Sequence, residues 1–356
     1  MTGCSSSHSN DGPTPTTTVS PETTTSAALS AKPPFRFFAS SSFWNTPIPA
    51  DATLDPSSSA TMGAFAELIT EEEQTRGGGP WINTIKYSVP IYTVGRNQPT
   101  VAVRLATLHP VPPLSAAWRA VPLPSDAQPA VGTDGDLVVW QPSTDRLWEF
   151  WRLVHEESGR WSASWGGAIQ NVSSNPGVYG PEAWPGAATV WGVSASSLSL
   201  VGGLISLEDL EKGQINHALS MSVPNVRAGV YALPAKRSDG TSTDPFSLPE
   251  GAHLRLDPSL DLAALHLPRL TLMIAEAAQR YGIIIRDHAK VVSFQAQAPK
   301  SGTPNPYTAP GGYFEGMKTP RKLLAAFPWN HLELLKLELH RAKPRRRRSA
   351  FGVPRI

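Results

Sequence analysis

Two carboxylates and two tryptophans share one face of a predicted β-hairpin. Residues 136–140 and 147–151 read Asp-Leu-Val-Val-Trp and Leu-Trp-Glu-Phe-Trp, with Pro-Ser-Thr-Asp between them. A turn centred near residues 143–144 puts Glu149 opposite Val138. Because side chains alternate along a strand, one face then carries four side chains with useful chemistry: Asp136, Trp140, Glu149 and Trp151.

Carboxylates beside indole rings suit a sugar polymer as ligand. The apolar faces of sugar rings rest on flat aromatic rings, while two acids flanking the scissile bond perform glycoside hydrolysis. The aromatic neighbours of Glu149 should desolvate it and raise its pKa, which makes it the expected proton donor. Asp136 is the expected second carboxylate. The alternative for Glu149 is a solvated position at a strand edge.

Tryptophans are concentrated in the middle of the chain. Of eleven in total, seven fall within one third of the sequence: Trp140, Trp148, Trp151, Trp161, Trp165, Trp184 and Trp191. Burying all seven would leave many indole N–H groups to satisfy. We therefore expect part of this cluster to line a ligand groove, with Trp140, Trp151 and Trp165 as sugar-binding residues. Core packing is the alternative for each ring taken singly.

Four further residues could take part in chemistry. His217, in Gln-Ile-Asn-His-Ala-Leu, could act as a general acid or base. It would serve β-elimination if Lys236 or Arg237 neutralised a uronate carboxylate. Asp287 lies at the start of a predicted tight turn. The alternatives are a buried, backbone-bonded imidazole, a solvated basic loop and a turn-forming aspartate.

Several well-known motifs are missing from the sequence. It has no phosphate-binding loop, no Rossmann fingerprint and no His-Glu-x-x-His, so we expect no nucleotide cofactor and assign no metal ligands. A Gly-x-Ser-x-Gly elbow is also missing, but a Ser/His/Asp site assembled from distant segments stays open. The net charge of +2 gives no reason to expect a nucleic acid partner.

The composition favours short strands joined by turns. The chain has 35 prolines and 28 glycines in 356 residues, which argues against a helical bundle. We predict a mainly β fold, β-sandwich or jelly-roll-like, with a few peripheral helices. Strands are expected within 80–92 and 100–108, and a second hairpin within 283–294.

Helices are expected in four places. Residues 206–212 begin with a capping pattern of Ser followed three residues later by Asp, and end at a glycine. Residues 267–281 carry apolar side chains at helical spacing before another glycine. Residues 60–73 and 328–341 complete the set.

The two ends of the chain differ from its middle. Small residues precede Cys4, as at the cleavage point of a bacterial lipoprotein signal peptide, so we expect Cys4 to be lipidated. The Ser/Thr/Pro-rich residues 1–34 are expected to be a disordered tether, followed by one β-rich domain over 35–340. Residues 341–356 form a basic tail. No stretch approaches a membrane span, so any anchoring would rest on the lipid alone.

One resemblance covers residues 130–295. The segments 213–219, 249–256 and 279–287, read Gly-Gln-Ile-Asn-His-Ala-Leu, Pro-Glu-Gly-Ala-His-Leu-Arg-Leu and Gln-Arg-Tyr-Gly-Ile-Ile-Ile-Arg-Asp, resemble a family of secreted bacterial β-rich proteins. The resemblance extends back through the segments around Glu149 and Trp165. It implies a single extracellular β-rich unit and adds weight to the acidic and histidine candidates, but it carries no established activity.

Together these features predict an extracytoplasmic protein, cell-surface lipoprotein or secreted, that acts on a polysaccharide or cell-wall glycan. Cleavage by carboxylate acid/base hydrolysis or by β-elimination is the leading hypothesis. The charged fraction of 17% fits a surface built from uncharged polar residues. The alternatives are a non-catalytic glycan-binding protein and a structural cell-envelope lipoprotein.

Overall fold

A computed structural model describes Met1 and residues 36–343, with gaps at 76, 108–110, 187–190 and 318–319. All of the described helices and strands lie within residues 36–356. The expected lipidation site Cys4, the tether up to residue 34 and the tail beyond Lys343 lie outside the described residues.

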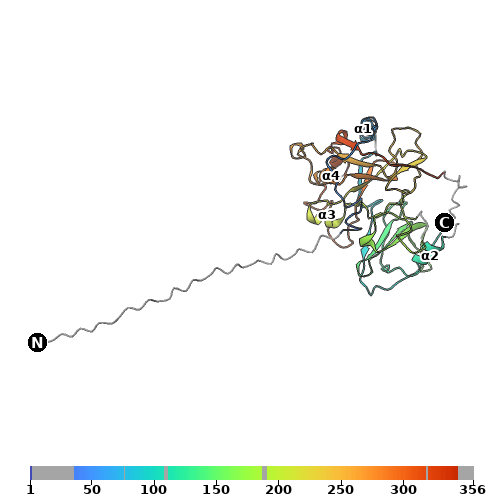
Figure 1. The fold of residues 1–356 in the computed structure, drawn as a ribbon. Helices are drawn as coiled ribbons and strands as arrows, with labels where there is room; N and C mark the ends of the chain where they lie inside the picture. The colour runs from blue at the N-terminus through green and yellow to red at the C-terminus, as the bar shows by residue number, and fades with distance from the viewer. Residues whose placement is uncertain (2–35, 76, 108–110, 187–190, 318–319, 344–356) are drawn as a thin grey trace. The chain divides into compact units, whose positions relative to one another are not determined.

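Most of the regular structure consists of strands in several mixed sheets, with few helices (Figure 1). One sheet has six strands, and two of its neighbouring pairs are parallel, β1 with β13 and β9 with β12. In spatial order its strands are Trp81–Asn83 (β1), Ser293–Gln295 (β13), Leu219–Val223 (β9), Ile283–His288 (β12), His253–Leu256 (β11) and Leu332–Leu334 (β14).

A second group of sheets is built mainly from residues 91–170. The four-stranded sheet has the order Ile91–Thr93 (β2), Leu137–Gln141 (β4), Arg146–Trp151 (β5) and Trp165–Gln170 (β8). A three-stranded sheet follows the order Val103–Leu105 (β3), Trp161–Ala163 (β7) and Val154–His155 (β6), and a further pair joins Val230–Ala232 (β10) to Leu339–Arg341 (β15). The sandwich or jelly-roll type expected from the sequence stays a prediction.

The described helices confirm three of the four expected from the sequence. They are Ser58–Gln74 (α1), Pro112–Ala117 (α2), Leu207–Lys212 (α3), Arg269–Arg280 (α4) and Arg321–Leu324 (α5), with short 3₁₀ turns at Pro142–Thr144 (η1), Val172–Ser174 (η2), Ala263–Leu265 (η3) and Trp329–His331 (η4). In α3 the expected capping box forms between Ser206 and Asp209. Gly213 then ends the helix at φ 68°, in the left-handed region that glycine adopts most easily.

The six-stranded sheet separates two hydrophobic cores. Helices α1 and α4 lie beside it (Figure 1) and contribute to the first core, which also contains Ile283 and Ile285 of β12. Between these two isoleucines, Ile284 points to the other face and packs in the second core with the hairpin β4–β5. Alternation along β12 therefore directs Ile284, and Arg286 two positions later, toward the four-stranded sheet.

The hairpin β4–β5 confirms the expected register. Glu149 pairs with Val138, and Trp140 pairs with Leu147. The turn is the 3₁₀ segment η1 followed by Asp145 at φ 54°. The four-stranded sheet thus presents Glu149 and Trp151 on the same face, as the pattern predicted.

The helix expected over residues 328–341 is wrong. Only the turn η4 is helical there, and the chain then enters β14, which pairs with β11. Leu332 and Leu334 are buried, while Glu333 between them bonds Arg255 on β11. The alternating burial of residues 332–334 is typical of a strand, although leucines three to four residues apart in this segment had suggested a helix.

The hairpin expected over residues 283–294 is also wrong. Its two segments do become strands β12 and β13, but β9 lies between them in the sheet. β9 pairs in parallel with β12 and antiparallel with β13. The partner strand comes from more than sixty positions earlier in the chain, so local turn patterns could not reveal it.

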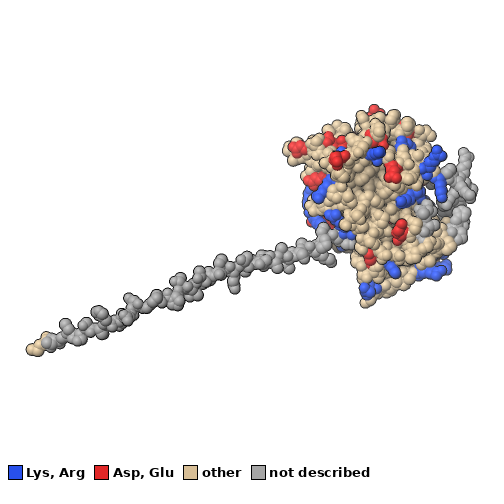
Figure 2. Space-filling view, viewed as in Figure 1, with Lys and Arg blue, Asp and Glu red and all other residues tan. Residues whose placement is uncertain are grey.

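Charged side chains are sparse and mixed in sign on the face drawn in Figure 2, with broad uncharged areas between them. This distribution follows from the low charged fraction of 17%. Within the part of the chain that the structure describes, no helix is both long and apolar enough to cross a membrane.

Candidate functional site

Glu149 is fully buried between the two large sheets. Its Oε1 accepts hydrogen bonds from the Ser199 hydroxyl and from the Leu200 N–H at 2.8 Å, and the Tyr179 hydroxyl lies next to the carboxyl group. Burial raises the pKa of Glu149, and these hydrogen bonds together with the charge of Arg286 only partly offset that effect. The carboxyl group is thus held in place but is closed to solvent.

Asp136 precedes β4 directly and keeps 9% of its surface exposed. Burial raises its pKa well above the usual range, and the nearby negative charge of Asp134 raises it further. Asp134 is half-buried and accepts a hydrogen bond from Trp151 Nε1 at 3.4 Å. A pair of carboxylates therefore lies beside Trp151, one of them biased toward the protonated form.

Asp134 is a site residue that the sequence argument missed. The Asp-Gly-Asp sequence of residues 134–136 could have indicated it as a second acid next to Asp136 in the chain.

Arg286 lies two positions after Ile284 on β12, so its side chain is directed toward the same face and toward this centre. The pairing with β9 shifts between Ile285 and Asp287, which leaves Arg286 as the extra residue. Its side chain is 1% exposed and its Nη1 donates to the Leu200 carbonyl at 2.9 Å. The charge of Arg286 acts on Asp136 and Glu149, so the six-stranded sheet supplies the cation for carboxylates carried by the neighbouring sheet.

Two half-buried indoles lie along the same face. Trp151 on β5 pairs with Trp165 on β8, and Glu149 further along β5 pairs with Gly167. The Arg152 guanidinium lies 4.3 Å from the centre of the Trp151 ring. The structure thus brings together four of the residues predicted from the sequence: Asp136, Glu149, Trp151 and Trp165.

Gly167 leaves room for a tyrosine over the buried glutamate. A Cβ at this position would lie 2.4 Å from Tyr179 Cε1, which is too close for any larger residue. The ring therefore packs on the glycine, with its hydroxyl directed toward Glu149. Burial and the adjacent carboxylate both raise the pKa of Tyr179, so its hydroxyl keeps its proton.

Polar atoms without partners gather in this region. Among the described residues, buried atoms that lack a hydrogen bond include Asp136 Oδ1, Trp165 Nε1 and Arg286 Nε. Protein interiors satisfy most such groups, so a concentration of them is typical of a site that takes up polar ligands or ordered water.

Asp287 lies at the edge of this centre and joins a second group of acids. Asp239, Glu250 and Asp287 each bring one carboxylate oxygen within 4.8 Å of the others, a set able to hold a metal ion. Burial raises the pKa of Asp287 to about 6, although Arg286 opposes this effect. Burial and the neighbouring acids raise the pKa of Glu250 well above its ordinary value.

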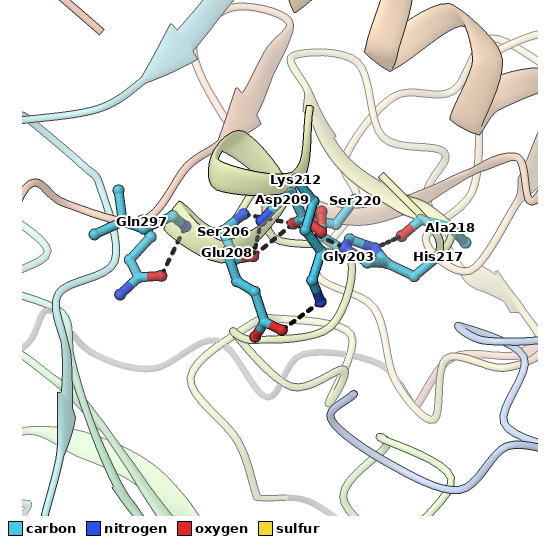
Figure 3. Close-up of polar contacts among 10 residues, drawn as sticks. Gly203, Ser206, Glu208, Asp209, Lys212, His217, Ala218, Ser220 and Gln297 are labelled. Atoms are coloured by element: carbon cyan, nitrogen blue, oxygen red, sulfur yellow. Dashed lines mark hydrogen bonds and ion pairs between the residues drawn. The ribbon is translucent and has the colours of Figure 1, made fainter. Parts of the chain in front are cut away.

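His217 belongs to a separate hydrogen-bonded group at the start of α3 (Figure 3). Its Nδ1 lies 2.9 Å from the Ala218 carbonyl oxygen, and its Nε2 lies 3.2 Å from Asp209 Oδ2. Burial disfavours the charged ring, but the Asp209 carboxylate outweighs burial and raises the pKa of His217. Both ring nitrogens are therefore engaged in holding the helix cap to the following strand.

The remaining predicted residues take up other positions. Trp140 is buried with its ring edge-on to Phe37. Lys236 is exposed, whereas the Arg237 guanidinium donates to Ser197 Oγ and to the carbonyls of Gly192 and Ser194. The side chain of Arg237 thereby ties residues 192–197 to the following loop.

A groove of about 720 Å³ lies on the opposite side of the four-stranded sheet. Its lining includes Trp118 and Trp161, and Trp118 packs on Phe150, whose side chain points away from Glu149. The groove is therefore separate from the carboxylate centre.

No family model, curated protein or solved structure matches the chain. Its function is therefore inferred from its own residues and their geometry.

Proposed function

We propose that the protein hydrolyses glycosidic bonds in a polysaccharide outside the cytoplasm. The observation that carries the proposal is the pair Asp134 and Asp136 beside the half-buried rings of Trp151 and Trp165. Flat aromatic rings offer a stacking surface to sugar rings, and two carboxyl groups in unequal environments provide an acid and a base.

In this proposal Asp136 is the acid. Burial and the neighbouring acids raise its pKa and favour the protonated form, so it can give its proton to the glycosidic oxygen as the bond from that oxygen to the anomeric carbon breaks. Asp134, which lies nearer to solvent, takes a proton from the attacking water. The water oxygen then bonds to the anomeric carbon, and Asp134 returns its proton through solvent.

Glu149 serves this site as a positioning residue. Because it is completely buried, it does not touch the substrate but places a second acidic group behind Asp136. Its charge and that of Asp134 both favour the protonated form of Asp136. The site therefore departs from the pairing of Glu149 and Asp136 that we expected from the sequence.

The β-elimination variant has less support. It needs His217 as a free base close to Lys236 or Arg237, but both ring nitrogens of His217 are engaged with Asp209 and Ala218. We therefore favour hydrolysis as the reaction class.

Asp136→Asn should reduce hydrolysis of a responsive polysaccharide by about a hundredfold or more, because it removes the donated proton while keeping the side chain's shape. Sugar affinity and melting temperature should stay near those of the unmodified protein. A screen of reducing-end release from a polysaccharide panel would identify the substrate. Asp145→Asn, at the far end of the same hairpin, is the matched control and should keep full activity.

Unchanged turnover in Asp136→Asn would remove Asp136 as the acid. If the protein binds glycans through Trp151 and Trp165 but releases no products from any of them, a non-catalytic glycan-binding protein becomes the better proposal. The half-buried paired indoles favour that second function independently of the acids.

The cellular location is part of the same proposal. We infer a surface lipoprotein or secreted protein, with Cys4 as the lipidated residue and a sandwich-like arrangement of sheets. With an upstream signal peptide supplied, the protein should fractionate with membranes, and Cys4→Ala should abolish that association. Equal membrane association of both forms would contradict the anchor.

A further inference from the structure

Three carboxylates converge from separate segments at one end of β12. Asp287 follows the bulge in β12, Asp239 lies in the loop after β10, and Glu250 lies in the turn before β11. One oxygen of each lies within 4.8 Å of the others. Like charges at this separation repel one another strongly where water is largely excluded, so the arrangement calls for a compensating positive charge.

Backbone N–H groups hold one oxygen of two of these acids. The Asp239 N–H donates to Glu250 Oε2 at 3.1 Å, and the N–H groups of Ala195 and His288 donate to Asp287 Oδ1 at 3.2 and 2.9 Å. Such contacts fix a carboxylate's orientation, as the outer contacts of metal ligands do. These hydrogen bonds engage Oε2 of Glu250 and Oδ1 of Asp287. The second oxygen of each carboxylate can then bind a ligand.

Glu250 provides an independent indication of a ligand. Its side chain is 0% exposed and lies next to the Ser238 hydroxyl, but its Oε1 accepts no hydrogen bond among the described residues. An ionised carboxylate is rarely fully buried unless it is paired or coordinates a metal. One carboxylate oxygen of this buried side chain belongs to the group that Asp239 and Asp287 complete.

We propose that Asp239, Glu250 and Asp287 bind a calcium ion. Carboxylate oxygens are the ligands of hard divalent cations, and the group contains no thiolate or imidazole that would favour zinc or copper. This inference goes beyond the proposed hydrolysis and does not rest on it, because the ion would bind whether or not the protein cleaves a glycan.

The origin of the ligands favours calcium over magnesium. Magnesium needs a nearly ideal octahedron with bonds of about 2.0–2.1 Å and keeps several waters, whereas calcium takes about six to eight oxygen ligands in flexible geometry. Calcium also accepts the irregular geometry that ligands from three loops provide.

The ion would link segments that are far apart in the sequence. The loop after β10, the turn before β11 and the end of β12 would all be held at one point. A ligand that binds only the folded state raises the free energy of unfolding, so calcium should stabilise the protein.

Isothermal titration of the EDTA-treated full chain with calcium chloride tests the proposal. We expect one ion per chain, a higher melting temperature with calcium, and weaker binding of magnesium. Glu250→Gln keeps the size of the side chain and should weaken calcium binding by about tenfold or more. Asp239→Asn, at a half-buried loop position, should do the same and serves if Glu250→Gln fails to fold.

Glu149→Gln is the matched control, since it removes another fully buried carboxyl group outside the three-acid group. It should bind calcium as tightly as the unmodified protein. Absence of both binding heat and thermal shift in the unmodified protein overturns the proposal, as does undiminished binding in the folded Glu250→Gln or Asp239→Asn variant. Tighter binding of magnesium overturns the choice of calcium. A glycan-hydrolysis assay plays no part in these outcomes.

Discussion

Trp148→Ala should lower the free energy of unfolding by about 3–5 kcal/mol, the usual cost of deleting a large buried aromatic side chain. Trp148 lies on the face of β5 opposite Glu149 and is 2% exposed. Its Nε1 donates to the Ala117 carbonyl at 3.0 Å, so the change also leaves a buried acceptor unpaired. Urea unfolding followed by circular dichroism would measure the loss.

Trp151→Ala is the matched comparison on the same strand. Its ring is half-buried on the face that carries Glu149, so truncation should cost only about 1–2 kcal/mol. In the proposed function it should also weaken sugar binding, whereas Trp148→Ala should leave the affinity of the folded fraction unchanged. Equal destabilisation by the two changes would assign Trp151 to the core and weaken the case for a sugar-binding face.

Arg286→Met should destabilise the protein by about 3–5 kcal/mol at about pH 8, because it leaves buried carboxylates without their cation. Arg286 is 1% exposed, and its charge acts on both Asp136 and Glu149. Methionine keeps much of the side chain's length, so the main loss is electrostatic. The double variant Arg286→Met/Glu149→Gln should recover part of the lost stability.

The stability lost in Arg286→Met should be smaller at lower pH. Folded-state pKa values of Asp136 and Glu149 are raised, so the folded protein holds their protons more tightly than the unfolded chain does. The free energy of unfolding therefore falls as the pH rises above the unfolded-state pKa values of about 4. It stops falling once the pH exceeds the folded-state pKa values.

Without Arg286 these pKa values rise further, so the cost of Arg286→Met should shrink at about pH 5. Unfolding titrations in EDTA at the two pH values would measure the difference. An equal loss at both would mean that Arg286 acts through packing rather than charge.

Local patterns predicted much of the site. The hairpin register followed from one turn and strict alternation, and it correctly placed Glu149 opposite Val138. The capping box at Ser206 followed from a spacing of three residues. Both depend only on neighbours in the sequence, where propensity and period act directly.

Long-range pairing could not be predicted in the same way. The effect of the Arg286 charge on the carboxylates depends on β9 inserting between β12 and β13 and on the six-stranded sheet packing against the four-stranded sheet. The convergence of Asp239, Glu250 and Asp287 likewise joins three segments through tertiary structure alone. The burial of Glu149 was expected from Trp148 and Phe150, but these rings point to the opposite face of β5. Residues distant in the sequence, including Tyr179 and Ser199, cover Glu149 instead.

The order of strands in the six-stranded sheet affects how the chain reaches its native state. One edge strand, β1, is among the first elements, and the other, β14, is among the last, while Trp81 of β1 pairs with Ser293. Pairing such distant residues incurs a large loop-closure entropy before any contact compensates, which makes folding slow. A growing chain cannot complete this sheet until Leu334 has been synthesised, so the two cores that it separates should consolidate together, late and cooperatively.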